Sequence, residues 1–176
     1  FLKEQGFTST IKRIGSQLGL KEGAVEPAPA APAESDYSLV QSIEALETWI
    51  AKAHEAGTVA FDTETTSLDA ARADLVGFSL SVRAGEACYV PLGHRPPDLL
   101  AEGEKLTQIP LAKALAALKP LLEDPAVLKI GQNIKYDMRV MAHHGIGIAP
   151  IDDSMLLSYV LDGGLHGHGM DELSKL

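Results

Sequence analysis

The sequence predicts an α/β domain in which helices flank a mixed β-sheet. Two observations lead to this fold class. Strand-like apolar runs alternate with segments of helical periodicity, and three such runs, 58–65, 75–82 and 87–90, follow one another without an intervening helix. Residues 83–86 form a short glycine-containing connection between the last two runs and fit a hairpin. These three strands are therefore expected to be antiparallel neighbours.

The folded domain is expected at residues 36–176. Residues 1–21 carry a helical pattern that is too small to bury its apolar face, so we interpret them as the end of a preceding unit. Residues 22–35 are rich in alanine and proline and predict a semi-extended linker. The first helix of the domain is predicted to begin after Ser42, which can cap it, and to end before Gly57.

The later elements are predicted from apolar spacing and from residues that start or stop helices. They are a helix, a strand and three further helices, at residues 110–120, 127–130, 133–144, 153–161 and 170–176. Pro110 suits a first helical position, and Pro120 is expected to disturb that helix. Gly145 stops the next helix, and an aspartate caps the one after it. The order β-β-β-α-β-α-α indicates a mixed sheet with helices against it.

The composition excludes several classes of protein. Fifteen basic and twenty-four acidic residues give a net charge of −9, which argues against binding nucleic acid by bulk charge alone. The single cysteine, Cys88, excludes an internal disulfide and a cysteine-rich zinc cluster, and it predicts a reducing, cytoplasmic setting. No apolar run has the length of a membrane-spanning helix, so no membrane partner is expected. Because the first residue is Phe1, the chain is expected to be a piece of a longer protein.

Asp62 and Glu64 lie two residues apart in the strand predicted at 58–65. Because side chains alternate between the faces of a strand, both carboxylates project from one face, and Val59 and Phe61 project from the other. Adjacent carboxylates repel each other unless cations lie between them, and Mg²⁺ or Mn²⁺ prefers such all-oxygen ligands. The alternative is a solvated polar face on an edge strand.

Asn133 and Asp137 lie one helical turn apart, directly after the strand predicted at 127–130. Ligand-binding groups collect where a strand of an α/β sheet passes into a helix, so Asp137 is a candidate third carboxylate for the first pair. The alternative is that Asn133 caps the helix and Asp137 is an ordinary surface acid.

Together, the segments Asp62-Thr63-Glu64 and Asn133-Ile134-Lys135-Tyr136-Asp137 resemble the first two motifs of one family. This family is the 3′–5′ exonuclease, or proofreading, domain of bacterial DNA polymerase I, which has a ribonuclease H-like fold. The resemblance covers nearly everything from residue 36 onward and includes residues 65–69, 89–94, 119–124 and 151–159. Residues 1–18 resemble the end of the 5′-nuclease region that precedes this domain, so 1–21 is expected to be its tail.

The resemblance implies a set of site residues, cofactors and partners. It implies that two divalent cations, Mg²⁺ or Mn²⁺, are held by the catalytic carboxylates of Asp62, Glu64 and Asp137. It also implies residues that bind the single-stranded 3′ end of DNA: Thr63, Leu68, Gln132, Asn133 and Tyr136. The expected function is the removal of mispaired 3′-terminal nucleotides during DNA replication and repair, beside a polymerase domain of the same parent chain.

Two departures from the family pattern affect these expectations. The third motif, Y-x-x-x-D, does not follow Asp137, since Tyr159 is followed four residues on by Gly163. The domain is therefore expected to be incomplete, and the chain alone to be a weak or inactive nuclease. Relatives often carry Arg-His where this chain has Gly167-His168, so a basic contact to DNA is expected to be missing.

Other functions remain as alternatives or are set aside. A ribonuclease D-like enzyme that trims RNA 3′ ends uses similar motifs, and a non-catalytic spacer of the same fold is a further alternative. His166 and His168 have the spacing of a metal pair, but without a third ligand nearby they are interpreted as part of a flexible loop. The sequence has neither a phosphate-binding P-loop nor a G-x-S-x-G nucleophile elbow.

Overall fold

The computed structural model describes residues 35–95 and 106–175. The chain divides into two compact units, of which the larger is Glu34–Leu157 and the other includes Ser158–Leu176. The preceding unit expected at 1–21 and nearly all of the linker expected at 22–35 lie outside the described residues. In the described part of the chain, no helix has the length and hydropathy of a membrane-spanning segment.

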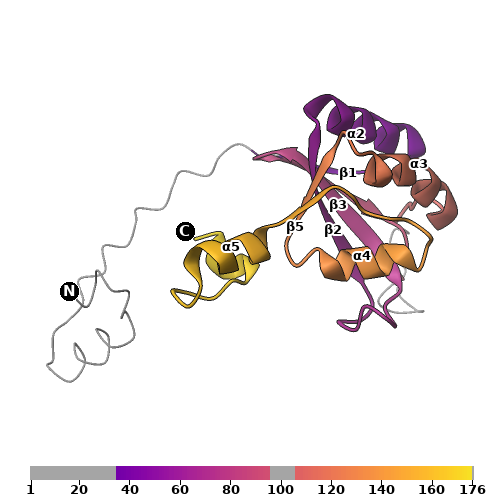
Figure 1. Ribbon diagram of the computed structural model, residues 1–176. Coiled ribbons are helices and arrows are strands. Elements are labelled where there is room, and N and C mark those ends of the chain that lie inside the picture. The colour runs from indigo at the N-terminus through magenta and orange to yellow at the C-terminus, as the bar shows by residue number, and fades with distance from the viewer. Residues whose placement is uncertain (1–34, 96–105, 176) are drawn as a thin grey trace, which may run out of the picture. The chain divides into compact units, whose positions relative to one another are not determined.

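The larger unit is built on one six-stranded mixed sheet (Figure 1). Its strands are β1 (Asp36–Leu39), β2 (Thr58–Thr65), β3 (Leu75–Arg83), β4 (Glu86–Pro91), β5 (Leu128–Gly131) and β6 (Ile151–Asp153). They lie in the order β1-β4-β3-β2-β5-β6. Strands β2, β3 and β4 are antiparallel neighbours, as predicted, whereas β1 pairs with β4, β5 with β2 and β6 with β5 in parallel. The predicted mixed sheet is thus confirmed.

Five helices complete the described elements: α2 (Ile43–Ala56), α3 (Leu111–Glu123), α4 (Lys135–Ala142), α5 (Ser154–Asp162) and α6 (Met170–Leu173). The predicted limits of α2 are confirmed, because the Ser42 hydroxyl accepts a hydrogen bond from the amide of Ala45 (3.2 Å). Gly57 ends the helix with a φ of 67°, in the left-handed region that favours glycine.

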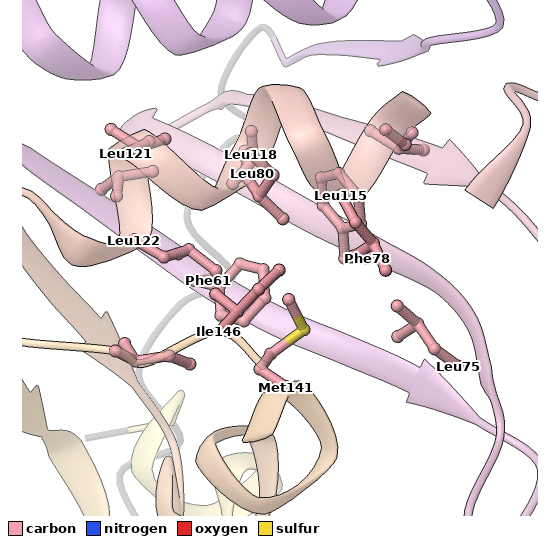
Figure 2. Packing of buried hydrophobic residues seen from close by; sticks show 14 of the residues in the cluster. Phe61, Leu75, Phe78, Leu80, Leu115, Leu118, Leu121, Leu122, Met141 and Ile146 are labelled. Carbon is pink, nitrogen blue, oxygen red and sulfur yellow. The ribbon is translucent and has the colours of Figure 1, made fainter. Parts of the chain in front are cut away.

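One face of the sheet carries the hydrophobic core. Phe61 on β2 is 1% exposed, and its ring centroid lies 6.0 Å from that of Phe78 on β3. Figure 2 shows Leu122 of α3 and Met141 of α4 beside Phe61, so helices distant in sequence pack on the same strand. Phe61 therefore points into the core, as predicted, and the residues that alternate with it on β2 project from the opposite face.

The structure differs from the predicted elements in three places. Helix α3 does not break at Pro120 but continues to Glu123, because the proline is on the exposed side while Leu121 and Leu122 are fully buried against the core. Strands β1 and β6 were not predicted. Both are short and mostly exposed, and so they lack an alternating apolar pattern, and their backbone pairing with β4 and β5 holds them in place.

Lys129 in β5 is fully buried, although the sequence predicted only an apolar strand there. Its ammonium group donates hydrogen bonds to the carbonyls of Asp124 (2.8 Å), Val127 (2.7 Å) and Ala149. Burial lowers the pKa of Lys129. The lysine therefore joins β5 to the loop before it and to the segment that leads into β6.

We expect Lys129→Met to destabilise the chain by about 2–4 kcal/mol, because methionine fills the space but leaves buried carbonyls without their donor. Urea unfolding measures this difference, with Lys113→Met at an exposed position of α3 as the matched control. The control is expected to stay within about 0.5 kcal/mol of the wild type. Equal effects of the two substitutions would contradict the structural role of Lys129.

Candidate active site

Strand β2 presents Asp62 and Glu64 on the face opposite Phe61. Asp62 is half-buried and Glu64 is exposed. Because β2 lies between β3 and β5, the alternative of a solvated edge strand is wrong. The pair is instead placed on an interior strand of the sheet, next to the start of α4.

Asp137 is a buried acid on α4, with 2% of its surface exposed. Its Oδ1 accepts hydrogen bonds from the amide (2.9 Å) and from the hydroxyl (2.6 Å) of Thr63. The alternative of an ordinary surface acid is therefore wrong. Thr63 stands between the two acidic residues of β2, so this contact joins the two sequence motifs directly.

The three carboxylates share one electrostatic environment. Burial, the charge of Asp137 and the charge of Glu64 together raise the pKa of Asp62 to about 6. Burial also raises the pKa of Asp137, against the opposing effect of the Thr63 hydrogen bonds. This is a site of uncompensated negative charge, and its all-oxygen donors fit a hard divalent cation.

The carboxylates of Asp62, Glu64 and Asp137 are not arranged as a metal-binding site in this structure. Within residues 35–95 and 106–175, no group of three acidic, histidine or cysteine side chains is arranged to hold a metal ion. Asp137 directs Oδ1 toward Thr63, and like charges repel one another. The shared role of Asp62, Glu64 and Asp137 as metal ligands therefore stays a prediction.

A cavity of about 350 Å³ opens beside Glu64 at the end of β2. It is lined by Thr63, Glu64, Thr65, Thr66, Ser67, Leu68 and Tyr136. The Tyr136 hydroxyl forms hydrogen bonds with the carbonyl of Ser67 and the hydroxyl of Thr65, so α4 fixes the start of the loop after β2. Leu68 lies in this loop with 99% of its side chain exposed, although an isolated leucine is expected in a core.

The turn between β5 and α4 holds Gln132 and Asn133. Asn133 has a φ of 58°, the left-handed conformation, and its buried Oδ1 has no hydrogen-bond partner. The N-cap of α4 is Ile134 without a side-chain hydrogen bond, so the alternative that Asn133 caps the helix is wrong. The carboxylate of Asp153 instead accepts hydrogen bonds from the amides of Asn133 (3.0 Å) and Ile134 (3.1 Å).

Asp153 and Tyr89 are neighbours of the site that sequence analysis did not single out. The Tyr89 ring lies over Gly77, the partner of Glu64 in the ladder, since a Cβ atom on Gly77 would come 2.1 Å from the Tyr89 hydroxyl. Burial and the charge of Glu64 raise the pKa of Tyr89. In the sequence, the only sign of this close approach of Tyr89 was Gly77, a glycine inside a predicted strand.

The histidines of the smaller unit pack against their own neighbours. His168 is buried, its Nδ1 lies 2.7 Å from the Ser158 hydroxyl, and its ring centroid lies 3.8 Å from that of Tyr159. The interpretation of this segment as a flexible loop is therefore wrong for His168.

The family comparison agrees with this geometry. A model of 3′–5′ exonucleases matches residues 37–176, which include both motifs. The chain belongs to the 3′–5′ exonuclease family. The residues that match the family model include every strand that contributes to the site.

Known relatives and structures extend the comparison. DNA polymerase I of Rhizobium leguminosarum is 46% identical to this 3′–5′ exonuclease chain, with the match covering 88% of the chain and 17% of that relative. The chain thus spans about a sixth of the curated relative it matches.

Two solved structures share the fold. The POL domain of Pol1 from M. smegmatis, with DNA primer-template and dNTP, has a TM-score of 0.60 at 19% identity, covering 79% of this chain and 22% of that one. Escherichia coli RNase D, an exoribonuclease, has a TM-score of 0.58 at 18% identity, covering 80% and 34%. The ribonuclease H-like exonuclease fold expected from the sequence is thereby confirmed.

We expect Asp62→Asn to make the metal-free protein more stable above pH 6 and equally stable below about pH 4. Folding raises the Asp62 pKa from 3.8 to about 6, so between these values the folded chain binds more protons than the unfolded chain. Wild-type stability therefore falls as pH rises through this window, whereas asparagine does not titrate. Thermal unfolding in EDTA across pH 4–8 measures the difference. Parallel curves for the two proteins would contradict it.

Proposed function

We propose that this domain removes nucleotides one at a time from the single-stranded 3′ end of DNA, using two divalent cations, Mg²⁺ or Mn²⁺. Membership of the 3′–5′ exonuclease family supports the reaction. The observation that carries the proposal is the contact of Asp137 with Thr63, which brings the acid of the second motif to the strand that carries Asp62 and Glu64. Burial and the charges of Asp137 and Glu64 raise the pKa of Asp62 to about 6. Such concentrated negative charge suits a cation site better than a structural role.

The acidic residues would divide the ligand positions. The charges of Asp137 and Glu64 both act on Asp62. Asp62 would therefore contact both cations, while Glu64 and Asp137 would complete their ligand sets. Bound cations would lower the pKa of a water molecule and stabilise charge on the attacking and leaving oxygens of the phosphodiester. Thr63 keeps Asp137 in place through two hydrogen bonds, so the protein, and not the substrate, determines where that carboxylate lies.

The remaining site residues would bind the terminal nucleotide. Tyr136 holds the loop after β2, and this loop presents the exposed Leu68 at the cavity, where it would pack on the terminal bases. Gln132 and Asn133 lie in the turn before α4, and the resemblance to the family supports the proposal that their amides also contact the nucleotide. A cavity of about 350 Å³ suits one nucleotide and not a duplex.

We also propose that the domain acts as the proofreading part of a DNA polymerase I. The 46% identity to the Rhizobium leguminosarum polymerase supports this context. A net charge of −9 is unsuited to holding duplex DNA, so the polymerase domain would supply that grip and only a short frayed end would reach the acidic site. An RNA-trimming role is less well supported, since the likeness to RNase D at 18% identity concerns the fold alone.

Asp62→Ala is expected to lower exonuclease activity more than 100-fold in the full-length protein while nucleotide incorporation stays near normal. Substitution of residues that hydrogen-bond to metal ligands already lowers metal affinity or activity roughly 10–100-fold. Loss of a ligand shared by both cations should lower activity further. The measurement is Mn²⁺-dependent degradation of a mismatched primer, and Asp36→Ala at the exposed sheet edge is the matched control. Undiminished degradation by Asp62→Ala would refute the proposal, because the activity would then not depend on this acidic site. Absence of Mn²⁺-dependent degradation by the wild-type protein would instead favour a non-catalytic spacer.

The substitution Leu68→Ala tests whether Leu68 contacts the substrate without contributing to the stability of the fold. Because Leu68 is 99% exposed, we expect its loss to change the free energy of unfolding by less than about 0.5 kcal/mol. Loss of an apolar contact with the terminal bases should raise KM for a single-stranded oligonucleotide by up to about tenfold. Leu111→Ala on α3 is the control. An unchanged KM for Leu68→Ala would remove this residue from the substrate site.

A further inference from the structure

The junction between β6 and α5 reaches across to the turn that begins α4. In the ladder between β5 and β6, Asp153 is the partner of Gly131, and it is only 5% exposed. Gly131 is followed by a tight turn, because a Cβ atom there would come 2.8 Å from the side chain of Ile134. The sheet therefore places a buried carboxylate beside the turn that precedes Asp137.

The Asp153 carboxylate accepts hydrogen bonds at the start of α5 and from the turn that precedes α4. On its own helix, α5, Oδ1 accepts hydrogen bonds from the amides of Met155 (3.0 Å) and Leu156 (3.3 Å). Across the ladder, Oδ1 also accepts from the amide of Asn133, and Oδ2 accepts from that of Ile134. An ordinary N-cap residue satisfies only its own helix, so the second pair of hydrogen bonds is the unusual feature.

These hydrogen bonds fix the approach of Asp137 to β2. Helix α4 lacks a side-chain cap of its own, and it begins after Asn133 with its φ of 58°. One turn later, Asp137 meets Thr63. The helix segment that carries the third candidate carboxylate is thus held at its start by Asp153 and at its acidic side chain by Thr63.

Ser154 adds a second contact to the same turn. Its hydroxyl donates to the carbonyl of Gly131 (3.0 Å) and lies 2.6 Å from Oε1 of Gln132. Ser154, at the start of α5, therefore also orients the side chain of Gln132, a candidate nucleotide-binding residue.

We propose that Asp153 is a positioning residue of the exonuclease site, which holds the turn 131–134 and the start of α4 so that Asp137 and Asn133 face the acidic pair of β2. The proposal rests on the exonuclease function proposed above. Asp153 contacts neither cation nor nucleotide in this role. It acts through the backbone of α4.

The decisive variant is Asp153→Ser in the full-length protein. Serine is a good N-cap and can still serve α5, but its single, shorter side-chain oxygen cannot also reach the amides of Asn133 and Ile134. We expect kcat for a single-stranded oligonucleotide to fall roughly 10–100-fold and the Mn²⁺ concentration for half-maximal activity to rise, with KM changing little. Nucleotide incorporation should be retained.

Two further measurements keep the test independent of folding. Amide hydrogen exchange of residues 133–137 should accelerate in Asp153→Ser, whereas a role confined to capping α5 would leave these amides protected. Should the serine variant unfold, Asp153→Asn supplies a narrower comparison, because its Oδ1 can still cap α5 while the amide nitrogen in place of Oδ2 cannot accept from the amide of Ile134. Asp152→Ser, the same kind of change at the exposed neighbour, is the matched control and is expected to behave like the wild type.

The outcomes separate this proposal from the proposed function. Folded Asp153 variants with wild-type kcat, Mn²⁺ dependence and amide protection, beside an inactive Asp62→Ala, would overturn the positioning role alone. A change confined to KM would also overturn it, because it would place Asp153 among the nucleotide contacts. Exonuclease activity that survives Asp62→Ala would overturn the proposed function itself.

Discussion

The parallel ladder between β2 and β5 ends at the pair Ala60 and Ile130, and β2 continues beyond it. The backbone amides of β2 that face β5 past this point need another acceptor, since a buried amide without a partner is costly. The carboxylate of Asp137 is that acceptor for Thr63. One backbone requirement of an interior strand therefore brings a third acid to the acidic pair and determines where α4 lies on the sheet.

This arrangement explains why negative charge accumulates at the end of β2 without unfolding it. The two buried acids described in this region receive hydrogen bonds, Asp137 from Thr63 and Asp153 from four amides. Asp62 makes no such contact among the described residues, and its pKa rises to about 6. The fold thus satisfies Asp137 and Asp153 with hydrogen bonds and leaves Asp62 without one among the described residues, as the proposed cation site requires.

Local patterns in the sequence predicted the elements that carry the motifs, because alternation and helical spacing are properties of neighbouring residues. Strand β2 has its predicted bounds, Phe61 is in the core, and Asp137 follows β5 on a helix. Contacts between distant segments were not predictable in this way. The acceptor for the amides of the turn before α4 is Asp153 on another strand, and the buried ammonium of Lys129 donates to carbonyls of two loops.

The strand pairing also has a consequence for the order of assembly. Strands β2, β3 and β4 pair with their neighbours in sequence, whereas β5 joins β2 from more than sixty residues away. Closing a long loop before contacts form is slow, so the local antiparallel meander is expected to precede the parallel additions. During synthesis on the ribosome, the Asp62 and Glu64 strand would therefore exist before Asp137 has been translated. The nuclease centre would be completed only at a late stage of folding, when β5, α4 and β6 dock together.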